Sequence, residues 1–211
     1  LATVRYAGIP TVVFSTGAVY PLSPVGSAGA AEETPPAPVG EYAQSALGRE
    51  RIFEFFSRER GTPVTILRLN YAVELRYGVL LDIARKVWDG SPIDLRMGHV
   101  NCIWQRDANA LALRCLSTAA SPPFVLNVTG AETLAVRTIA MRFGELLGRG
   151  QSLRGEEEPT ALLSNARRAR ELCGPPSVEI DTVMEWVADW VRNGGPTLEK
   201  PTHFETRDGR F

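Results

Sequence analysis

The sequence predicts an α/β fold, and three observations support that prediction. Apolar runs at residues 11–14 (TVVF) and 64–67 (VTIL) are typical of buried strands. Between them, residues 41–60 follow a helical pattern, with an apolar face formed by Leu47, Ile52, Phe53, Phe55 and Phe56. Gly61 ends this helix before Pro63. A strand–helix–strand order indicates a parallel sheet with a right-handed crossover.

The rest of the chain continues the alternation. Strands are expected at residues 100–104 and 124–128. Further helices are expected over residues 79–88, 107–116, 134–147, 161–174 and 183–195.

Chain ends and helix starts carry their own signals. Residues 1–8 resemble the end of a helix, and the proline-rich residues 21–40 read as a loop. Asp107 and Thr133 are placed to cap two of the later helices. The polar, proline-containing tail at 196–211 is expected to lie extended over the surface.

Composition narrows the class of protein. With 211 residues and 44% hydrophobic content, the chain can bury the core of one or two domains. A net charge of −1 gives no reason to expect nucleic acid or an acidic membrane surface as a partner. No apolar run reaches the length of a membrane span and no signal-peptide pattern opens the chain, so we expect a cytoplasmic protein.

Cysteine and histidine usage gives no sign of a metal site. Cys102, Cys115 and Cys173 lie far apart and show neither metal-ligand nor disulfide spacing, which indicates reduced thiols. The two histidines, His99 and His203, stand outside any cluster of ligating residues. We therefore expect no bound metal.

The first strand ends in a polar cluster, Ser15, Thr16 and Gly17. Open α/β sheets bind ligands outside the carboxyl ends of their strands. The helix that follows carries Tyr42 in its first turn. A hydroxyl at a strand end and a tyrosine at a helix start form a candidate acid–base pair.

This pair resembles that of the extended short-chain dehydrogenase/reductases, the NAD-dependent epimerase/dehydratase family. In that family a strand ends in S-[ST]-x-x-V-Y, and Y-x-x-x-K follows about 25 residues later. Counting back four residues from Tyr20 places the family's catalytic serine or threonine on Thr16, and its tyrosine falls on Tyr42. The lysine is missing, because position 46 is Ala46. The resemblance covers residues 5–195.

The resemblance implies a fold and a domain division. Residues 1–78 would form the C-terminal part of a Rossmann-like, doubly wound parallel sheet. Residues 79–211 would form mainly a small α+β substrate domain, with strands near 100–105 and 124–128 interleaved with the sheet. No glycine-rich phosphate loop lies between a strand and a helix, so the family's N-terminal pyrophosphate-binding part is missing and we expect a fragment.

The resemblance also implies hydride chemistry. NAD or NADP would be the cofactor, a nucleotide sugar the small-molecule substrate, and the tyrosine-bearing helix a homodimer contact. Tyr42 would be the base and Thr16 the partner of the reacting oxygen, with Ser15 as second choice. A lysine about 5 Å away would stabilise a phenolate by roughly 3 kcal/mol. Arg49, two turns after Tyr42, is the candidate replacement. The alternative for Tyr42 is an aromatic side chain packed under the loop.

Further pocket residues follow from the second strand. By resemblance, Asn70 and Tyr71 would line the nicotinamide and sugar pocket, and Gly17, Asn70 and Arg76 would contact substrate. The alternatives are that Asn70 bonds its local backbone and that Arg76 caps the next helix. Two functions stay open. One is an epimerase or dehydratase with transient hydride transfer, and the other is a non-catalytic nucleotide- or partner-binding module that lost turnover with the lysine.

Overall fold

A parallel three-stranded sheet forms the centre of one half of the molecule. The computed structural model describes residues 8–210, so the helix end expected at residues 1–8 lies outside them except for Gly8. The strands are β1 (Thr11–Thr16), β3 (Val64–Leu69) and β8 (Phe124–Val128), in the order β1-β3-β8. Thr16 pairs with Leu69 and Leu69 with Val128, so all three strands end at one edge. The expected α/β fold with a parallel sheet is confirmed.

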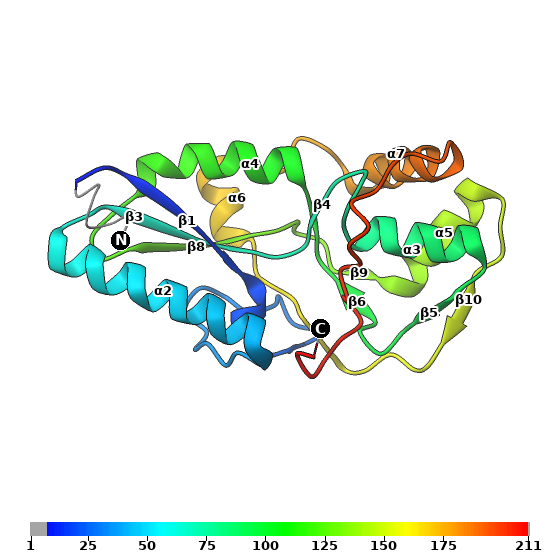
Figure 1. Cartoon of the computed structure of the whole chain (residues 1–211), viewed down its shortest axis with the longest axis horizontal. Helices are drawn as coiled ribbons and strands as arrows, with labels where there is room; N and C mark the ends of the chain where they lie inside the picture. The colour runs from blue at the N-terminus through cyan, green and yellow to red at the C-terminus, as the bar shows by residue number, and fades with distance from the viewer. Residues whose placement is uncertain (1–7, 211) are drawn as a thin grey trace.

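Helices cover both faces of this sheet (Figure 1). Because side chains alternate along a strand, Val64 and Ile66 face α2 (Gly40–Arg60), whereas Leu67 faces the opposite side. That opposite side is covered by α4 (Gln105–Arg114), the short helix η2 (Cys115–Thr118) and α6 (Arg167–Cys173). The crossover through α2 therefore has the layered arrangement that parallel strands require.

A second apolar core lies in the other half, where three helices pack against one another (Figure 1). These are α3 (Val79–Asp89), α5 (Val136–Leu147) and α7 (Ile180–Arg192). Four two-stranded pairs surround the cores: β2 (Ser23–Pro24) with β11 (Thr160–Ala161), β4 (Ala72–Val73) with β7 (Ile103–Trp104), β5 (Pro92–Asp94) with β10 (Ser152–Arg154), and β6 (His99–Val100) with β9 (Leu134–Ala135). The domain division at residue 78 stays a prediction.

The buried face of α2 differs from the one expected. Its buried residues are small or polar: Ala43, Ala46, Glu50 and Ser57. Ile52 and Phe55 instead face outward, with exposed fractions of 56% and 58%. Small side chains let the helix approach the sheet closely, which the apolar pattern alone did not indicate.

A buried ion pair fixes α2 to the sheet. The Arg68 guanidinium on β3 donates to both carboxylate oxygens of Glu50, at 3.0 and 2.7 Å. Ser15 on β1 donates to the same carboxylate. Arg68 also donates to the Tyr20 hydroxyl at 2.8 Å, and that hydroxyl donates to Asn127 on β8 at 2.8 Å. The network joins α2 to all three strands, and Glu50 lies two turns after Tyr42 on the helix.

Both expected helix caps are wrong. α4 begins at Gln105, and the Asp107 carboxylate accepts instead from the backbone N–H groups of Ser177 and Val178, at 3.0 and 3.2 Å. α5 begins at Val136, because residues 134–135 pair with β6 before the helix starts. In both places a contact distant in sequence overrides the local capping signal.

Three other segments also depart from expectation. The strand expected at 100–104 is split into β6 and β7, and the helix expected over 161–174 forms only as α6, because its first residues pair with β2 and Ala30. The C-terminal tail is not merely a surface segment. Its Phe204 is only 2% exposed and packs in the core of α3, α5 and α7.

The cysteines form no disulfide, and two of their thiols have raised pKa values. All three cysteines are unpaired. Burial raises the pKa of the Cys102 thiol to about 12 and that of Cys115 to about 11, so neither is a thiolate near neutrality. Across residues 8–210, no helix combines the length and the apolar character needed to cross a membrane, and no three acidic, histidine or cysteine side chains are grouped to hold a metal.

Candidate functional site

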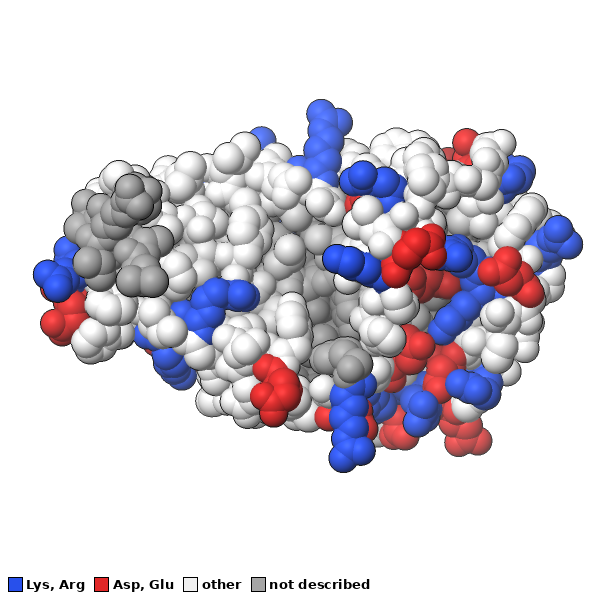
Figure 2. Space-filling view, viewed as in Figure 1, with Lys and Arg blue, Asp and Glu red and all other residues white. Residues whose placement is uncertain are grey.

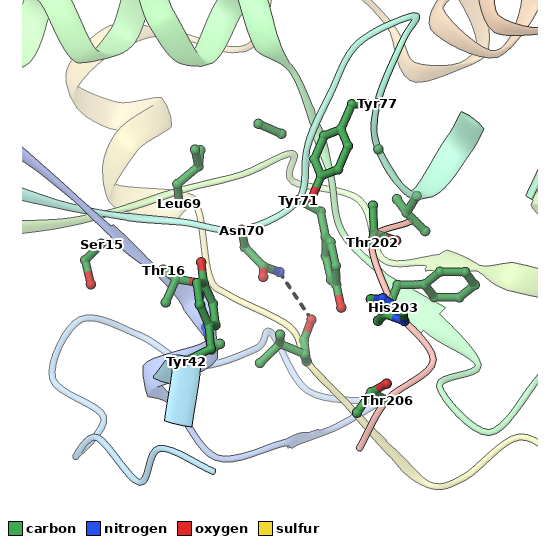
Figure 3. Close-up of a pocket in the computed structure, with 16 residues that line it drawn as sticks. Ser15, Thr16, Tyr42, Leu69, Asn70, Tyr71, Tyr77, Thr202, His203 and Thr206 are labelled. Carbon is green, nitrogen blue, oxygen red and sulfur yellow. Dashed lines mark hydrogen bonds between the residues drawn. The ribbon is translucent and has the colours of Figure 1, made fainter. Parts of the chain in front are cut away.

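A cavity of about 470 Å³ opens at the carboxyl edge of the sheet (Figure 3). The ends of β1 and β3, the start of α2, the entry to α3 and the C-terminal tail all contribute to its wall. The lining residues are Ser15, Thr16, Ala18, Tyr42, Leu69, Asn70, Tyr71, Ala72, Tyr77, Gly78, Val79, Leu162, Thr202, His203, Phe204 and Thr206.

Thr16 and Tyr42 both line this cavity, although 25 residues separate them in the chain. Thr16 ends β1, and its hydroxyl oxygen accepts from the Ala18 N–H at 3.1 Å, which starts the short helix η1 (Gly17–Val19). A hydroxyl that accepts one hydrogen bond can still donate its own proton. The Tyr42 side chain is 52% exposed and lines the cavity from the first turn of α2. The structure thus brings the predicted pair to one site.

The site receives no cation from α2. Ala46 is 1% exposed and packs against Val19, Tyr20 and Ala30, so the face one turn beyond Tyr42 is closed by apolar side chains. Arg49 is exposed on the helix surface and does not line the cavity. The arrangement does not place Arg49 where the family's lysine would act.

Asn70 and Tyr71 line the cavity as expected from their position after β3. The Asn70 amide donates to Asn101 at 2.8 Å and to the Leu162 carbonyl at 3.2 Å, so it bonds distant groups rather than its local backbone. Tyr71 has a φ of 43°, a conformation that non-glycine residues seldom adopt. Such strain is concentrated at functional sites.

Gly17 and Arg76 do not line the cavity. A Cβ atom at Gly17 would lie 2.7 Å from the Asn70 side-chain oxygen, so glycine allows the end of β1 to approach Asn70. Gly17 therefore affects the cavity indirectly, by allowing Asn70 its position in the wall. Arg76 pairs with Glu74 at 3.1 Å, and its side chain is largely exposed.

The wall of the cavity holds few charges. Within residues 8–210 no lysine, arginine, aspartate or glutamate lines it; its titratable groups are three tyrosines and His203. Burial raises the pKa of Tyr71, and the nearby Glu205 and Tyr77 add to this effect. Burial also raises the pKa of Tyr77, with further contributions from Asp82 and Tyr42. Both phenols therefore remain hydrogen-bond donors at neutral pH.

Sequence reasoning missed the contribution of the tail. Thr202, His203, Phe204 and Thr206 lie far along the chain from the strand ends, yet they form one wall of the cavity. The tail has no helical or strand period that would predict burial. Its one signal was Phe204, a large apolar residue among polar ones.

Comparisons with solved structures show the fold of this chain. UDP-glucose 4-epimerase from Thermus thermophilus in complex with NAD matches with a TM-score of 0.76, at 20% identity over 90% of this chain and 66% of that one. The dTDP-glucose 4,6-dehydratase from Bacillus anthracis, in complex with NAD, gives a TM-score of 0.76 at 16% identity, over 90% of this chain and 64% of that one. No protein-family model and no curated protein matches the sequence.

A third similar structure contains a nucleotide sugar with a carboxylate. UDP-glucuronic acid 4-epimerase from Bacillus cereus, in complex with UDP-glucuronic acid and NAD, matches with a TM-score of 0.72 at 16% identity, over 86% of this chain and 61% of that one. The chain thus has the Rossmann-type fold of these NAD-bound enzymes and spans between 61% and 66% of their length.

Proposed function

We propose that the chain belongs to the extended short-chain dehydrogenase/reductases and serves an NAD-dependent epimerase or dehydratase that acts on nucleotide sugars. The observation that carries the proposal is the pairing of Thr16 and Tyr42 in one cavity, at the strand ends of a fold shared with such enzymes. The similar structures were solved with NAD, two of them as UDP-sugar epimerases. NAD is the favoured cofactor, and NADP is its alternative.

The residues of the cavity fit a nicotinamide and a sugar. Its wall combines hydroxyl and amide groups with the apolar faces of Leu69 and Leu162. NAD, when bound, supplies the hydride acceptor. In the proposed site Tyr42 takes the proton of the substrate hydroxyl and Thr16 donates a hydrogen bond to the same oxygen. Ser15, Asn70 and Tyr71 contribute to the wall that holds the two ligands.

One electrostatic contribution to a Tyr42 phenolate comes from α2 itself. Tyr42 is the third residue of the helix, in the first turn, where the backbone N–H groups of an α-helix give its start a partial positive charge. Such a terminus stabilises a negative charge by about 0.3–1 kcal/mol, less than a neighbouring ammonium group. We therefore expect slow turnover.

Calorimetric titration of NAD and NADH tests the proposal. The titrations use this chain and a version extended by its natural upstream sequence. We expect tight binding by the extended version, and Tyr42→Phe in that version should retain cofactor binding while losing turnover of UDP-glucose by at least about 100-fold. Absence of cofactor binding by both versions would contradict the proposal.

A second candidate is a nucleotide-binding module without turnover. The buried, apolar surroundings of Ala46 favour it, because they leave the cavity without the cation that activates the tyrosine in the family. In this case the extended version binds NAD, but UDP-glucose, UDP-glucuronic acid and dTDP-glucose all remain unchanged on incubation. Conversion of any of them excludes this candidate.

We also propose a homodimer formed through α2. The outward-facing Ile52 and Phe55 on this helix support it, because large exposed apolar side chains are typical of contact surfaces. The cytoplasmic location expected from the sequence stays a prediction.

A further inference from the structure

The C-terminal strap, residues 198–209, runs between the two halves of the molecule (Figure 1). Four of its residues line one side of the cavity. Its first part is fixed to the α3 side. The Leu198 N–H donates to the Arg76 carbonyl at 3.1 Å, and the backbone and hydroxyl of Thr202 both donate to Asp82, at 2.8 and 2.6 Å. Lys86 on α3 pairs with Glu205 at 3.2 Å.

The second part of the strap is held by Arg207 and Gly209. Arg207 donates to the Thr160 carbonyl at 2.7 Å and to its hydroxyl at 2.6 Å. Gly209 packs against Gly40 so closely that a Cβ atom at either glycine would overlap the other's backbone. Gly40 is the first residue of α2 and precedes Tyr42 by two positions, so the end of the strap packs on the helix turn that carries Tyr42. It therefore connects the α3 side of the cavity to the helix that carries the proposed base.

His203 lies between Thr202, which donates to Asp82, and Phe204, which is buried in the core of α3, α5 and α7. Its φ is 52°, in the left-handed region that disfavours side chains. Among residues 8–210 only three non-glycine residues have a positive φ: Tyr71, which lines the same cavity, and Glu199 and His203 in the strap. The fixed neighbours hold a strained backbone that sets the position of the His203 side chain at the cavity.

His203 is also chemically distinct among the lining residues. Among the described lining residues it is the one side chain able to carry a positive charge, since the others are phenols, hydroxyls, an amide and apolar groups. Figure 3 shows it on the strap side, across the cavity from Thr16 and Tyr42. A ligand oriented by Thr16 and Tyr42 at one end would meet His203 on the other side.

We propose that His203 is a substrate-binding residue that donates to an anionic oxygen of the substrate, either of a diphosphate or of a sugar carboxylate. The inference rests on the proposed function, because a nucleotide sugar supplies both kinds of oxygen. An imidazole N–H can donate to either kind of oxygen, and a hydrogen bond to an ionised acceptor is stronger than one between neutral groups. The strap thus adds to the site a recognition group that the strand ends lack.

The test compares two His203 variants by calorimetry, with UDP, UDP-glucose and UDP-glucuronic acid as ligands. His203→Asn retains the backbone, because asparagine tolerates the left-handed region, but removes the imidazole. His203→Arg supplies a longer, charged donor at the same position. We expect His203→Asn to weaken binding by about ten-fold or more and His203→Arg to retain most of it. Lys200→Ala, which removes an exposed charge from the same strap, is the matched control and should leave affinity unchanged.

The three ligands separate the two sources of negative charge. Loss of affinity for all three, UDP included, assigns His203 to the diphosphate. Loss for UDP-glucuronic acid alone assigns it to the carboxylate. Equal affinities of His203→Asn and the unchanged chain for all three ligands would overturn the proposal, as would failure of the unchanged chain to bind any of them. NAD titration of the extended version reports separately on the proposed function, and His203→Asn should leave it unaltered.

Discussion

Ala46 is the residue at which this chain departs from the sequence pattern it resembles, and its surroundings decide what a lysine would do there. The side chain faces Val19, Tyr20 and Ala30 and is almost wholly buried. A cation at this position would leave water for an apolar cluster instead of reaching the cavity. The packing around Ala46 thus disfavours a lysine at this position.

Ala46→Lys should therefore destabilise the protein. We expect the free energy of unfolding to fall by about 2–4 kcal/mol, because an ammonium group is buried without a partner. Ser45→Lys on the exposed side of α2 is the control, with a change of about 0.5 kcal/mol or less. Urea denaturation measures both. If the two variants are equally stable, the Ala46 face is more open than its packing indicates.

Asp94 gives a stability that depends on pH. Its carboxylate is buried, and hydrogen bonds from Arg96 hold its pKa at about 2, below its ordinary value of 3.8. Because the pKa is lowered on folding, this stability is present above pH 3.8 and is lost as the pH falls through about 2.

We expect Asp94→Asn to lower the free energy of unfolding by about 1–2 kcal/mol at pH 7, a discounted value because Arg96 is solvent-exposed. The difference from the unchanged chain should shrink as the pH falls from 4 toward 2. Urea denaturation at several pH values measures it. A constant difference across this range would show that Asp94 stabilises by packing rather than by charge.

At the scale of elements, the position of α2 depends on the pair of Glu50 and Arg68. Both side chains are buried, and together with Ser15 and Tyr20 they join the helix to the sheet. Since Tyr42 lies on the same helix, this network helps to set the position of the proposed base relative to Thr16 at the cavity.

Glu50→Ala should cost about 3–5 kcal/mol of unfolding free energy, because it leaves the Arg68 charge buried and unpaired. Glu54→Ala on the same helix removes the exposed pair with Arg51 and should cost less than about 1 kcal/mol. Chemical denaturation of both variants gives the comparison. A loss of equal size in the two would mean that the network does not hold α2 in place.

At the scale of the whole molecule, the two halves differ in surface chemistry. Figure 2 shows charged side chains gathered over the half that carries α3, α5, β5 and β10, with few over the β1 side. There Phe14 is exposed on β1, which within residues 8–210 pairs with β3 alone in the main sheet. A sparsely charged face beside a strand edge that is unpaired among residues 8–210 is a surface that tends to associate.

We expect self-association that depends on concentration, through the exposed Ile52 and Phe55 side chains of α2. Sedimentation velocity at increasing concentration should show dimers of the unchanged chain, and Ile52→Glu with Phe55→Glu should shift them to monomers. The control is Leu113→Glu on α4, an exposed leucine on the other side of the sheet. Dimers that persist in the double variant would place the contact elsewhere, with the β1 edge as the next surface to test.

The sequence alone determined the elements whose signals are local. The apolar runs at 11–14 and 64–67, the long helix between them and the glycine stops require only neighbouring residues, and each is present in the structure. That Thr16 and Tyr42 line one cavity was also predictable, because the end of a parallel strand and the start of its crossover helix meet at one edge of a sheet.

Tertiary structure decided what depends on contacts between distant residues. Asp107 and Thr133 look like caps, but long-range pairing sets the real helix starts. The face of α2 that is buried follows from the sheet it packs on, and His203 enters the cavity because residues more than 100 positions away hold the strap. Local patterns carry no information about such partners, because the free energy of those contacts exists only once the chain has folded.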